Sequence, residues 1–345
     1  MRIAIVAGPW LSVPPKGYGG TEFVISKLVD GLVDRGHDVL LLAPGDSITK
    51  ARLIPLVKRH IGQDWQEYGQ PLSSALSEYA FVRSYLEQAD IIHDHTMYHN
   101  TWLPMKVVYT LHGPAERGMA ELARRMSAFG QNNYFVAISN RQRQLFGEDG
   151  INFVSTVHNC IDVDAIPYSD QKGDYLFFVG RVNWEKGLDL AIRIAVVSKR
   201  KLVMAIKMTE AHEQEYFRET IKPLLPGADI EILEDISNEE KFNLFKHAYA
   251  TLFTSQWEEP FGLVITESLA AGTPVIALRR GAAPEIIKGG VCGFLGDSFD
   301  DLVEALNHVP EIRPHACRRH VVEHFSIEKM VAGYEAAYRA VLYGS

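Results

Sequence analysis

Short apolar runs alternate with amphipathic stretches along the 345 residues of the chain, in two consecutive series. Strands that are separated by helices form parallel sheets with helices on both faces. A chain of this length is also too long for one ordinary hydrophobic core. We therefore expect two doubly wound α/β domains. The expected strands are residues 2–8, 38–43, 90–94, 106–111, 133–138 and 153–157 in the first series, and 175–180, 202–207, 228–233, 249–254, 274–278 and 291–295 in the second.

A polar, turn-rich stretch at residues 159–174 separates the two series. Its proline and glycine are typical of a linker between domains. The sequence therefore predicts an N-terminal domain at residues 1–165 and a C-terminal domain at residues 166–325. Residues 326–345 are expected to carry a long terminal helix.

The overall composition excludes several classes of protein. A hydrophobic content of 47% and a charged content of 23% are ordinary values for a globular chain. The net charge of −8 argues against nucleic acid as a partner. The first apolar run is too short for a signal peptide, and no apolar stretch approaches the roughly 20 residues of a membrane span. The three cysteines lack metal-ligand spacing and are expected to be reduced, so we expect a cytoplasmic protein.

Basic residues cluster in the first domain, for example at Arg124 and Arg125 and at Arg141 and Arg143. Such clusters fit a lipid headgroup or a phosphorylated substrate, which leaves peripheral contact with a membrane open. Solvated helix faces explain them equally well.

The strongest chemical signal lies between Glu259 and Ala277. Residues 263–271 have the pattern of an apolar helix that runs into a buried strand, and Glu267 lies inside that helix. A buried carboxylate is costly unless hydrogen-bond donors meet it. No donor lies nearby in the sequence, whereas a polyhydroxylated ligand would supply several. The alternative is an ordinary helix start with a solvated glutamate.

Glu259 precedes this helix, in a loop that Pro260 and Gly262 shape. The backbone N–H groups of Gly262 and Leu263 have no partner within the helix, so they form a site for an anion. The loop and the helix together offer two acceptors for hydroxyl groups and one cradle for a phosphate. This combination fits a nucleotide sugar.

Two cations follow the strand at residues 175–180. Arg181 comes directly after the strand, and Lys186 opens the next helix. Cations at a helix N-terminus oppose the helix dipole, which makes a purely structural role unattractive. Their position predicts a clamp for a diphosphate, and solvated surface charges are the alternative.

The first domain offers weaker signals at its strand ends. The loop after the first strand ends in Gly17-Tyr18-Gly19-Gly20, and it is too long for a dinucleotide-binding fingerprint. It suits a backbone that presses against a phosphate or a sugar, and a tight turn is the structural alternative. His112 ends the strand at residues 106–111.

The sequence His93-Asp94-His95 does not predict a metal site. Alternation along a strand places His93 and His95 on one face and Asp94 on the other, so the three side chains do not converge easily. Asp94 and His95 are instead expected to face an acceptor. The one Asp-x-Asp sequence in the chain, Asp162-Val163-Asp164, lies in the predicted linker and not at a predicted strand end, so it is not expected to hold a metal diphosphate.

Taken in order, these motifs resemble the retaining glycosyltransferases of family 4, whose C-terminal half carries a Glu-x7-Glu motif of this kind. The resemblance covers most of the chain. It implies the GT-B fold, in which two doubly wound (Rossmann-like) domains face a central cleft and the last helix crosses back to the N-terminal domain. The segments that carry it are Gly17-Tyr-Gly-Gly-Thr-Glu22, His93-Asp-His95, Leu111-His-Gly113, Ser139, His158-Asn-Cys-Ile-Asp162, Val179-Gly-Arg181 with Lys186-Gly187, and Glu259 to Glu267.

The resemblance implies transfer of a hexose from a UDP- or GDP-sugar, with retention at the anomeric carbon and without a metal or another cofactor. The acceptor would be a carbohydrate, a small molecule or a lipid-linked molecule. The implied catalytic residues are His112, Arg181, Lys186 and Glu259. The implied donor-binding residues are Gly19, Gly20, Arg181, Lys186, Lys207, Phe261, Gly262, Leu263 and Glu267. Tyr18, Asp94 and His95 are implied on the acceptor side.

The chain departs from the family pattern at two turns. Cys160 replaces the usual glycine of an Asn-Gly-Ile/Val-Asp turn, and Lys207 lies where a glycine-rich turn is usual. Lys207 can therefore reach the diphosphate or the base, or be exposed. Three other functions fit the sequence less well: a nucleotide-sugar epimerase of the same architecture, a sugar phosphorylase, and a non-catalytic nucleotide-sugar-binding subunit.

Overall fold

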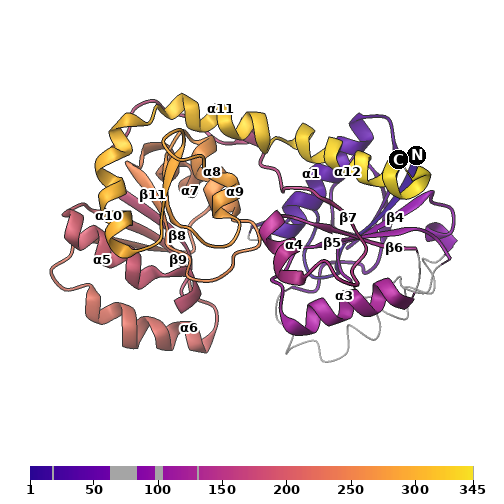
Figure 1. The fold of residues 1–345 in the computed structure, drawn as a ribbon, viewed down its shortest axis with the longest axis horizontal. Coiled ribbons are helices and arrows are strands. Elements are labelled where there is room, and N and C mark those ends of the chain that lie inside the picture. Colours follow the sequence, from indigo (N-terminus) through magenta and orange to yellow (C-terminus); the bar gives the residue numbers. More distant parts are fainter. Residues whose placement is uncertain (18, 63–83, 98–103, 130–131, 345) are drawn as a thin grey trace. The chain divides into compact units, whose positions relative to one another are not determined.

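The computed structural model describes residues 1–17, 19–62, 84–97, 104–129 and 132–344 (Figure 1). The chain forms two compact units. We call Met1–Cys160 with Ile327–Ser345 the N-terminal unit, and Ile161–Ser326 the C-terminal unit. Each unit is built on a parallel sheet of the doubly wound type, as the strand pattern predicts.

The N-terminal unit contains a seven-stranded sheet in the order β3-β2-β1-β4-β5-β6-β7. Alternate strand residues, such as Ala4 and Val6, join the core that α3 covers. The strands are β1 Arg2–Val6, β2 Asp38–Ala43, β3 Arg52–Pro55, β4 Ile91–Asp94, β5 Val107–Leu111, β6 Asn133–Ala137 and β7 Phe153–Thr156; the helices are α1 Gly20–Asp34, α3 Arg117–Phe129, α4 Asn140–Phe146 and α12 Ile327–Tyr343.

The strand β3 is absent from the sequence-based prediction. It is a four-residue edge strand in which only Ile54 is buried. A single buried position gives no alternation that could distinguish a strand from a loop.

The C-terminal unit contains a six-stranded sheet in the order β10-β9-β8-β11-β12-β13. The strands are β8 Leu176–Arg181, β9 Leu202–Lys207, β10 Ile230–Glu234, β11 Ala250–Phe253, β12 Val275–Leu278 and β13 Gly293–Gly296. The α-helices are α5 Leu188–Ser198, α6 Ala211–Tyr216, α7 Asn238–His247, α8 Leu263–Ala270, α9 Ala283–Ile286, α10 Phe299–His308 and α11 Pro314–His324. Short turns of other helix types are η1 Val163–Ala165, η2 Trp184–Lys186, η3 Phe217–Ile221, η4 Lys222–Leu224 and η5 Val309–Glu311.

The strand order of this sheet reverses between β8 and β11. These two strands are parallel neighbours, although β9, β10 and the helices that follow them lie between β8 and β11 in the sequence. In open parallel sheets, ligands bind beyond the carboxyl ends of the strands at such a reversal. The sheet therefore directs attention to the loops that follow β8 and β11.

The terminal helix α12 belongs to the N-terminal unit and lies beside α1 (Figure 1). A Cβ atom built on Gly31 of α1 would lie 2.6 Å from a methyl group of Val331, so the two helices approach closely there. The buried carboxylate of Glu335 accepts hydrogen bonds from Arg35 at 3.0 and 2.8 Å and forms a 2.8 Å contact with the ring of His37. Burial alone would raise the pKa of Glu335, but the contacts with Arg35 and His37 outweigh it and lower that pKa.

Along the part of the chain that the structure describes, no helix is both long enough and apolar enough to span a membrane.

We expect Glu335→Gln to lower the free energy of unfolding of the N-terminal unit by about 1–3 kcal/mol, because it weakens three contacts to a buried group. The matched change Glu328→Gln, at an exposed position of the same helix, should alter it by no more than about 0.5 kcal/mol. Because the pKa of Glu335 is lowered in the folded protein, its contribution is present above the usual carboxyl pKa and is lost as the pH falls through the folded value. Urea unfolding at neutral and acidic pH measures both effects. Equal stabilities of the two variants at neutral pH would contradict this account.

Candidate active site

The loops after β8 and β11 bring Lys186 and Glu259 together. The Lys186 ammonium donates to Glu259 Oε2 at 2.6 Å, and it lies 5.1 Å from the centre of the Trp257 ring. The indole N–H of Trp257 donates to the same oxygen at 2.7 Å. Glu259 Oε1 has no protein partner among the residues that the structure describes. This carboxylate is therefore held rigidly through one oxygen and offers the other to a ligand.

Two glycines, one in the loop after β8 and one in the turn after β12, leave room for the backbone that carries Glu259 or lies beside it. A Cβ atom on Gly187, which has a φ of +66°, would lie 2.1 Å from the carbonyl oxygen of Thr254. A Cβ atom on Gly281 would lie 2.5 Å from the backbone of Glu259. Neither position has room for a side chain, so backbone packing fixes both ends of the Lys186–Glu259 pair.

The helix α8 begins directly after this loop, as its sequence predicts. Gly262 precedes the first turn with a φ of +102°, a left-handed conformation that favours glycine. Phe261 is buried and packs edge-on against Phe325. Phe261 thus anchors the loop directly before the first turn of α8, the turn at which the sequence predicts an anion site.

Glu267 has a protein partner that the sequence-based prediction missed. Lys241, from α7, donates to Glu267 Oε1 at 2.8 Å, and both side chains are largely buried. No donor lies near Glu267 in the sequence, as predicted, but a protein donor reaches it from a distant segment, so a ligand is not the only group that can meet this carboxylate. The partner lies 26 residues upstream, beyond the reach of local sequence patterns. Within the described residues Glu267 Oε2 has no protein partner, so it can still accept a hydroxyl group.

Arg181 is also held by carboxylates. Its Nε donates to Glu213 Oε1 at 2.6 Å, and its Nη2 donates to Glu210. Glu213 is fully buried, and its other oxygen accepts from the backbone N–H groups of Thr209 at 2.8 Å and Glu210 at 3.0 Å. Burial would raise the pKa of Glu213, but these hydrogen bonds outweigh it and the pKa is lowered. Both carboxylates come from the turn that opens α6, and the sequence-based prediction missed them.

These pairs qualify the argument that Arg181 and Lys186 have no structural role. Each cation has a carboxylate partner in the protein. An ammonium group has three N–H donors, and a guanidinium group has five. Both side chains therefore keep donors for a ligand after their protein contacts are made.

The remaining predicted donor residues lie at strand ends or helix starts. Lys207 is the last residue of β9 and is half-buried. Gly20 begins α1, and a Cβ atom on the preceding Gly19 would lie 2.8 Å from Pro15. Tyr18 lies outside the described residues.

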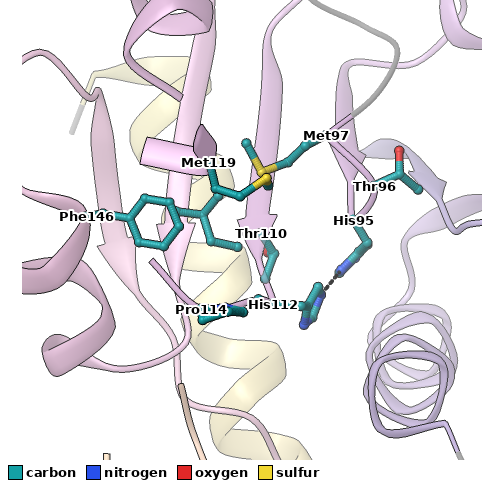
Figure 2. Close-up of a pocket in the computed structure, with 10 residues that line it drawn as sticks. His95, Thr96, Met97, Thr110, His112, Pro114, Met119 and Phe146 are labelled. Atoms are coloured by element: carbon teal, nitrogen blue, oxygen red, sulfur yellow. Dashed lines mark hydrogen bonds between the residues drawn. The ribbon is translucent and has the colours of Figure 1, made fainter. Parts of the chain in front are cut away.

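In the N-terminal unit, the ends of β4 and β5 bring His95 and His112 together. His95 Nδ1 and His112 Nε2 are 2.7 Å apart (Figure 2). The pair borders a cavity of about 130 Å³ whose other side is apolar, with Met97, Met119 and Phe146 (Figure 2). Burial lowers the pKa of His112 to about 4.

Asp94 does not face this cavity. It is fully buried, and its Oδ1 accepts from the backbone N–H groups of Thr96 at 2.6 Å and Met97 at 3.2 Å. Its place in the structure is that of a turn-shaping residue, because a short acidic side chain at a strand end caps the backbone that follows. This differs from the predicted contact with an acceptor. Among the described residues, no group of three His, Cys, Asp or Glu side chains is placed to hold a metal ion.

Both halves of the chain match models of known protein families. Residues 18–165 match the family model described as Glycosyltransferase Family 4, and residues 164–320 match the model described as Glycosyl transferases group 1. Together with the two parallel sheets, these matches identify the chain as a glycosyltransferase of the GT-B type.

Two relatives illustrate the range of named activities. The chain is 32% identical over 186 residues to D-inositol 3-phosphate glycosyltransferase of Thermobifida fusca, a match that covers 49% of this chain and 43% of the relative. It is 25% identical over 376 residues to N-acetyl-alpha-D-glucosaminyl L-malate synthase of Bacillus anthracis, which covers 94% of both. The chain thus matches less than half the length of the first relative and nearly all of the second.

Solved structures share the fold. A glycosyltransferase involved in avilamycin A biosynthesis has a TM-score of 0.70 at 24% identity, over 100% of this chain and 98% of that one. Sucrose-phosphate synthase from Thermosynechococcus elongatus has a TM-score of 0.78 at 16% identity, over 100% of both chains. HepE of Anabaena, in complex with UDP and glucose, has a TM-score of 0.72 at 18% identity, over 97% of this chain and 98% of that one. At these identities the likeness establishes the fold alone.

The two carboxylates that hold Arg181 should contribute unequally to stability. Glu213→Gln should destabilise the turn at residues 207–213 by about 1–3 kcal/mol, because it disturbs a buried group with several charge-assisted hydrogen bonds. Glu210→Gln removes an exposed ion pair and should cost between about 0 and 1 kcal/mol. Hydrogen exchange of the Thr209 and Glu210 amides, followed by mass spectrometry of that segment, measures the difference. Similar protection in both variants would show that Glu213 does not anchor the turn.

Proposed function

We propose that the protein transfers a hexose from a nucleotide-diphosphate sugar to an acceptor hydroxyl group, with retention at the anomeric carbon and without a metal ion. The observation that carries the proposal is the junction of Lys186, Glu259 and the first turn of α8 at the reversal of the sheet. It combines a cation, free backbone N–H groups and a carboxylate oxygen that has no protein partner in the described structure. A diphosphate joined to a sugar is the ligand that uses all three.

The leaving diphosphate would be stabilised by Lys186, Arg181 and the backbone N–H groups at the start of α8. Charge stabilisation by groups that are already in position is usually the largest catalytic contribution. Glu259 and Trp257 hold Lys186 in place, so the Lys186 side chain loses less conformational entropy when the reaction takes place. We name no enzyme nucleophile. The departing phosphate would take the proton of the acceptor hydroxyl group as that oxygen attacks from the same face.

Glu259 would orient the transferred sugar through Oε1. Glu267 would receive the ribose hydroxyl groups through Oε2, while Lys241 fixes its other oxygen. Phe261, Gly262 and Leu263 would cradle the diphosphate, Gly19 and Gly20 would press their backbone against it, and Lys207 would reach the diphosphate or the base.

The donor is proposed to be a UDP- or GDP-sugar. The Anabaena protein of the same fold was solved with UDP and glucose, which favours a UDP-sugar. The names of the relatives include an inositol phosphate and malate, so a small hydroxylated acceptor is included beside carbohydrate and lipid-linked ones. The three cysteines are buried and none of them forms a disulfide bond in the described structure, which fits a reducing compartment, and we propose a cytoplasmic location.

The test is to incubate the protein with UDP- and GDP-hexoses in excess EDTA, with and without candidate acceptors, and to identify the products by mass spectrometry and NMR. A product that carries one added hexose with the anomeric configuration of the donor is expected. Free epimerised sugar in the absence of an acceptor would identify an epimerase instead. Loss of transfer in EDTA that Mg²⁺ or Mn²⁺ restores would reject the metal-free mechanism.

In that assay Lys186→Ala should lower turnover by at least about a hundredfold at saturating donor, because stabilisation of the leaving group acts mainly in the transition state. Lys201→Ala is the matched control. Lys201 is a half-exposed cation of the same unit; it directly precedes β9 and pairs with Glu231 of β10. This variant should leave turnover unchanged. Near-normal turnover of the Lys186 variant would show that Lys186 does not belong to the clamp.

The two glutamates should affect different kinetic constants. Glu267 would hold a part of the donor that does not react, so Glu267→Gln should mainly raise KM and weaken binding of the free nucleoside diphosphate. Glu259 would position the reacting sugar, so Glu259→Gln should mainly lower kcat while the diphosphate still binds. Isothermal titration with the diphosphate and donor-saturation kinetics measure both. Equal loss of diphosphate affinity in the two variants would contradict this division.

A further inference from the structure

The hydrogen bond between His95 and His112 defines where the protons of both rings lie. Burial lowers the pKa of His112 to about 4, and burial together with the charges of His93 and His112 lowers the pKa of His95 well below its usual value. Both rings are therefore neutral at neutral pH, and each carries one N–H group. Of the two nitrogens that are 2.7 Å apart, one donates and the other accepts.

The other nitrogen of His95 decides between the two arrangements. His95 Nε2 is fully buried and has no hydrogen-bond partner in the described part of the structure. If His112 Nε2–H donated to His95 Nδ1, the single proton of His95 would lie on this buried Nε2. A buried N–H group without a partner is rare and costs about 1–3 kcal/mol, and an unpaired acceptor is tolerated better. The proton of His95 therefore lies on Nδ1, which donates to His112 Nε2.

We propose that His95 is a positioning residue that holds His112 in the Nδ1–H tautomer, so that His112 meets its ligand as a hydrogen-bond donor to an oxygen atom. His112 Nε2 is occupied by His95, and His112 Nδ1 has no protein partner among the described residues and is not sealed from solvent. An imidazole in this tautomer can donate to a sugar or phosphate oxygen and cannot accept a proton through Nδ1. Only the identity of the ligand rests on the proposed function.

A second layer of hydrogen bonds fixes the ring of His93, against which His95 packs. The ring centres of His93 and His95 are 4.0 Å apart. His93 Nδ1 lies 2.7 Å from the hydroxyl oxygen of Tyr338, and His93 Nε2 lies 2.7 Å from the hydroxyl oxygen of Thr110. The hydroxyl groups of Thr110 and Tyr334 are 3.0 Å apart. Both tyrosines belong to α12, so the terminal helix supports the ring against which His95 packs.

The direct test is a long-range proton–nitrogen NMR spectrum of the free protein labelled with [15N]histidine. The chain has 13 histidines, and the signals of His112 are those that disappear in His112→Gln. The expected pattern is a protonated Nδ1 and an unprotonated Nε2 at neutral pH. A protonated Nε2 in the wild-type protein would overturn the proposal, and this measurement needs no folded variant of His95.

Two variants separate the hydrogen bond from the shape of the ring. In His95→Asn the side-chain amide places an N–H group where the ring Nδ1–H lay, so the tautomer of His112 should be retained. His95→Leu removes the donor, so the proton of His112 should move at least partly to Nε2 and kcat/KM should fall by about tenfold or more. Affinity for the free nucleoside diphosphate should stay unchanged in both. Equal losses of kcat/KM with an unchanged tautomer in both variants would reduce His95 to a packing role and overturn the proposal.

The outcomes for this proposal and for the proposed function are separable. Protein that shows the Nδ1–H tautomer but transfers no hexose would support the tautomer assignment and overturn the function. Protein that transfers hexose with His112 in the Nε2–H form would do the reverse.

Discussion

The parallel pairing of β8 with β11 is the constraint on which the candidate active site depends. The two strands are far apart in the sequence, yet their carboxyl ends lie at the same edge of the sheet. The loops that follow therefore meet, and Lys186 and Glu259 come within 2.6 Å of each other. Gly187 makes the meeting possible, because a side chain there would collide with Thr254 of the opposite loop; Gly281, in the turn after β12, leaves room for the backbone of Glu259. The location of the site is thus a consequence of strand order, and the charged residues determine only which ligand it suits.

Charge pairing within the protein is the second common feature of this site. Lys186, Arg181 and Lys241 each form an ion pair with a carboxylate of the protein itself. Such pairs are worth little at an exposed surface. Their effect here is geometric, since long cationic side chains lose much of their rotamer freedom before a ligand arrives. A site that is ordered in advance reorganises less when negative charge develops, which is the property that electrostatic catalysis requires.

Much of this arrangement could be predicted from local sequence, and the rest could not for identifiable physical reasons. Buried parallel strands are continuous apolar runs, so all but one of the thirteen strands in the described part of the chain are visible in the sequence; the exception is β3, with its single buried residue. Helix α8, Glu267 within it and Glu259 in the preceding loop were predicted because the glycine, the apolar run and the acidic residues are close together in the sequence. Lys241 and Glu213 were not, because each acts on a residue 26 or 32 positions away and neither position has a pattern that reveals its partner.

The histidines show a further limit of local patterns, since alternation correctly places His93 and His95 on one face but does not locate a proton. That location follows from the long-range contact with the ring of His112 and from the burial of His95 Nε2, which has no hydrogen-bond partner among the described residues. A series of hydrogen bonds lies next to these two histidines. It begins at Tyr338 and Tyr334 of α12 and reaches His93 and Thr110. Because hydroxyl groups can donate or accept, this outer layer adapts to either tautomer of His93. Within the residues that the structure describes, no hydroxyl group bonds to His95 or His112, so the fold determines the tautomer of this pair.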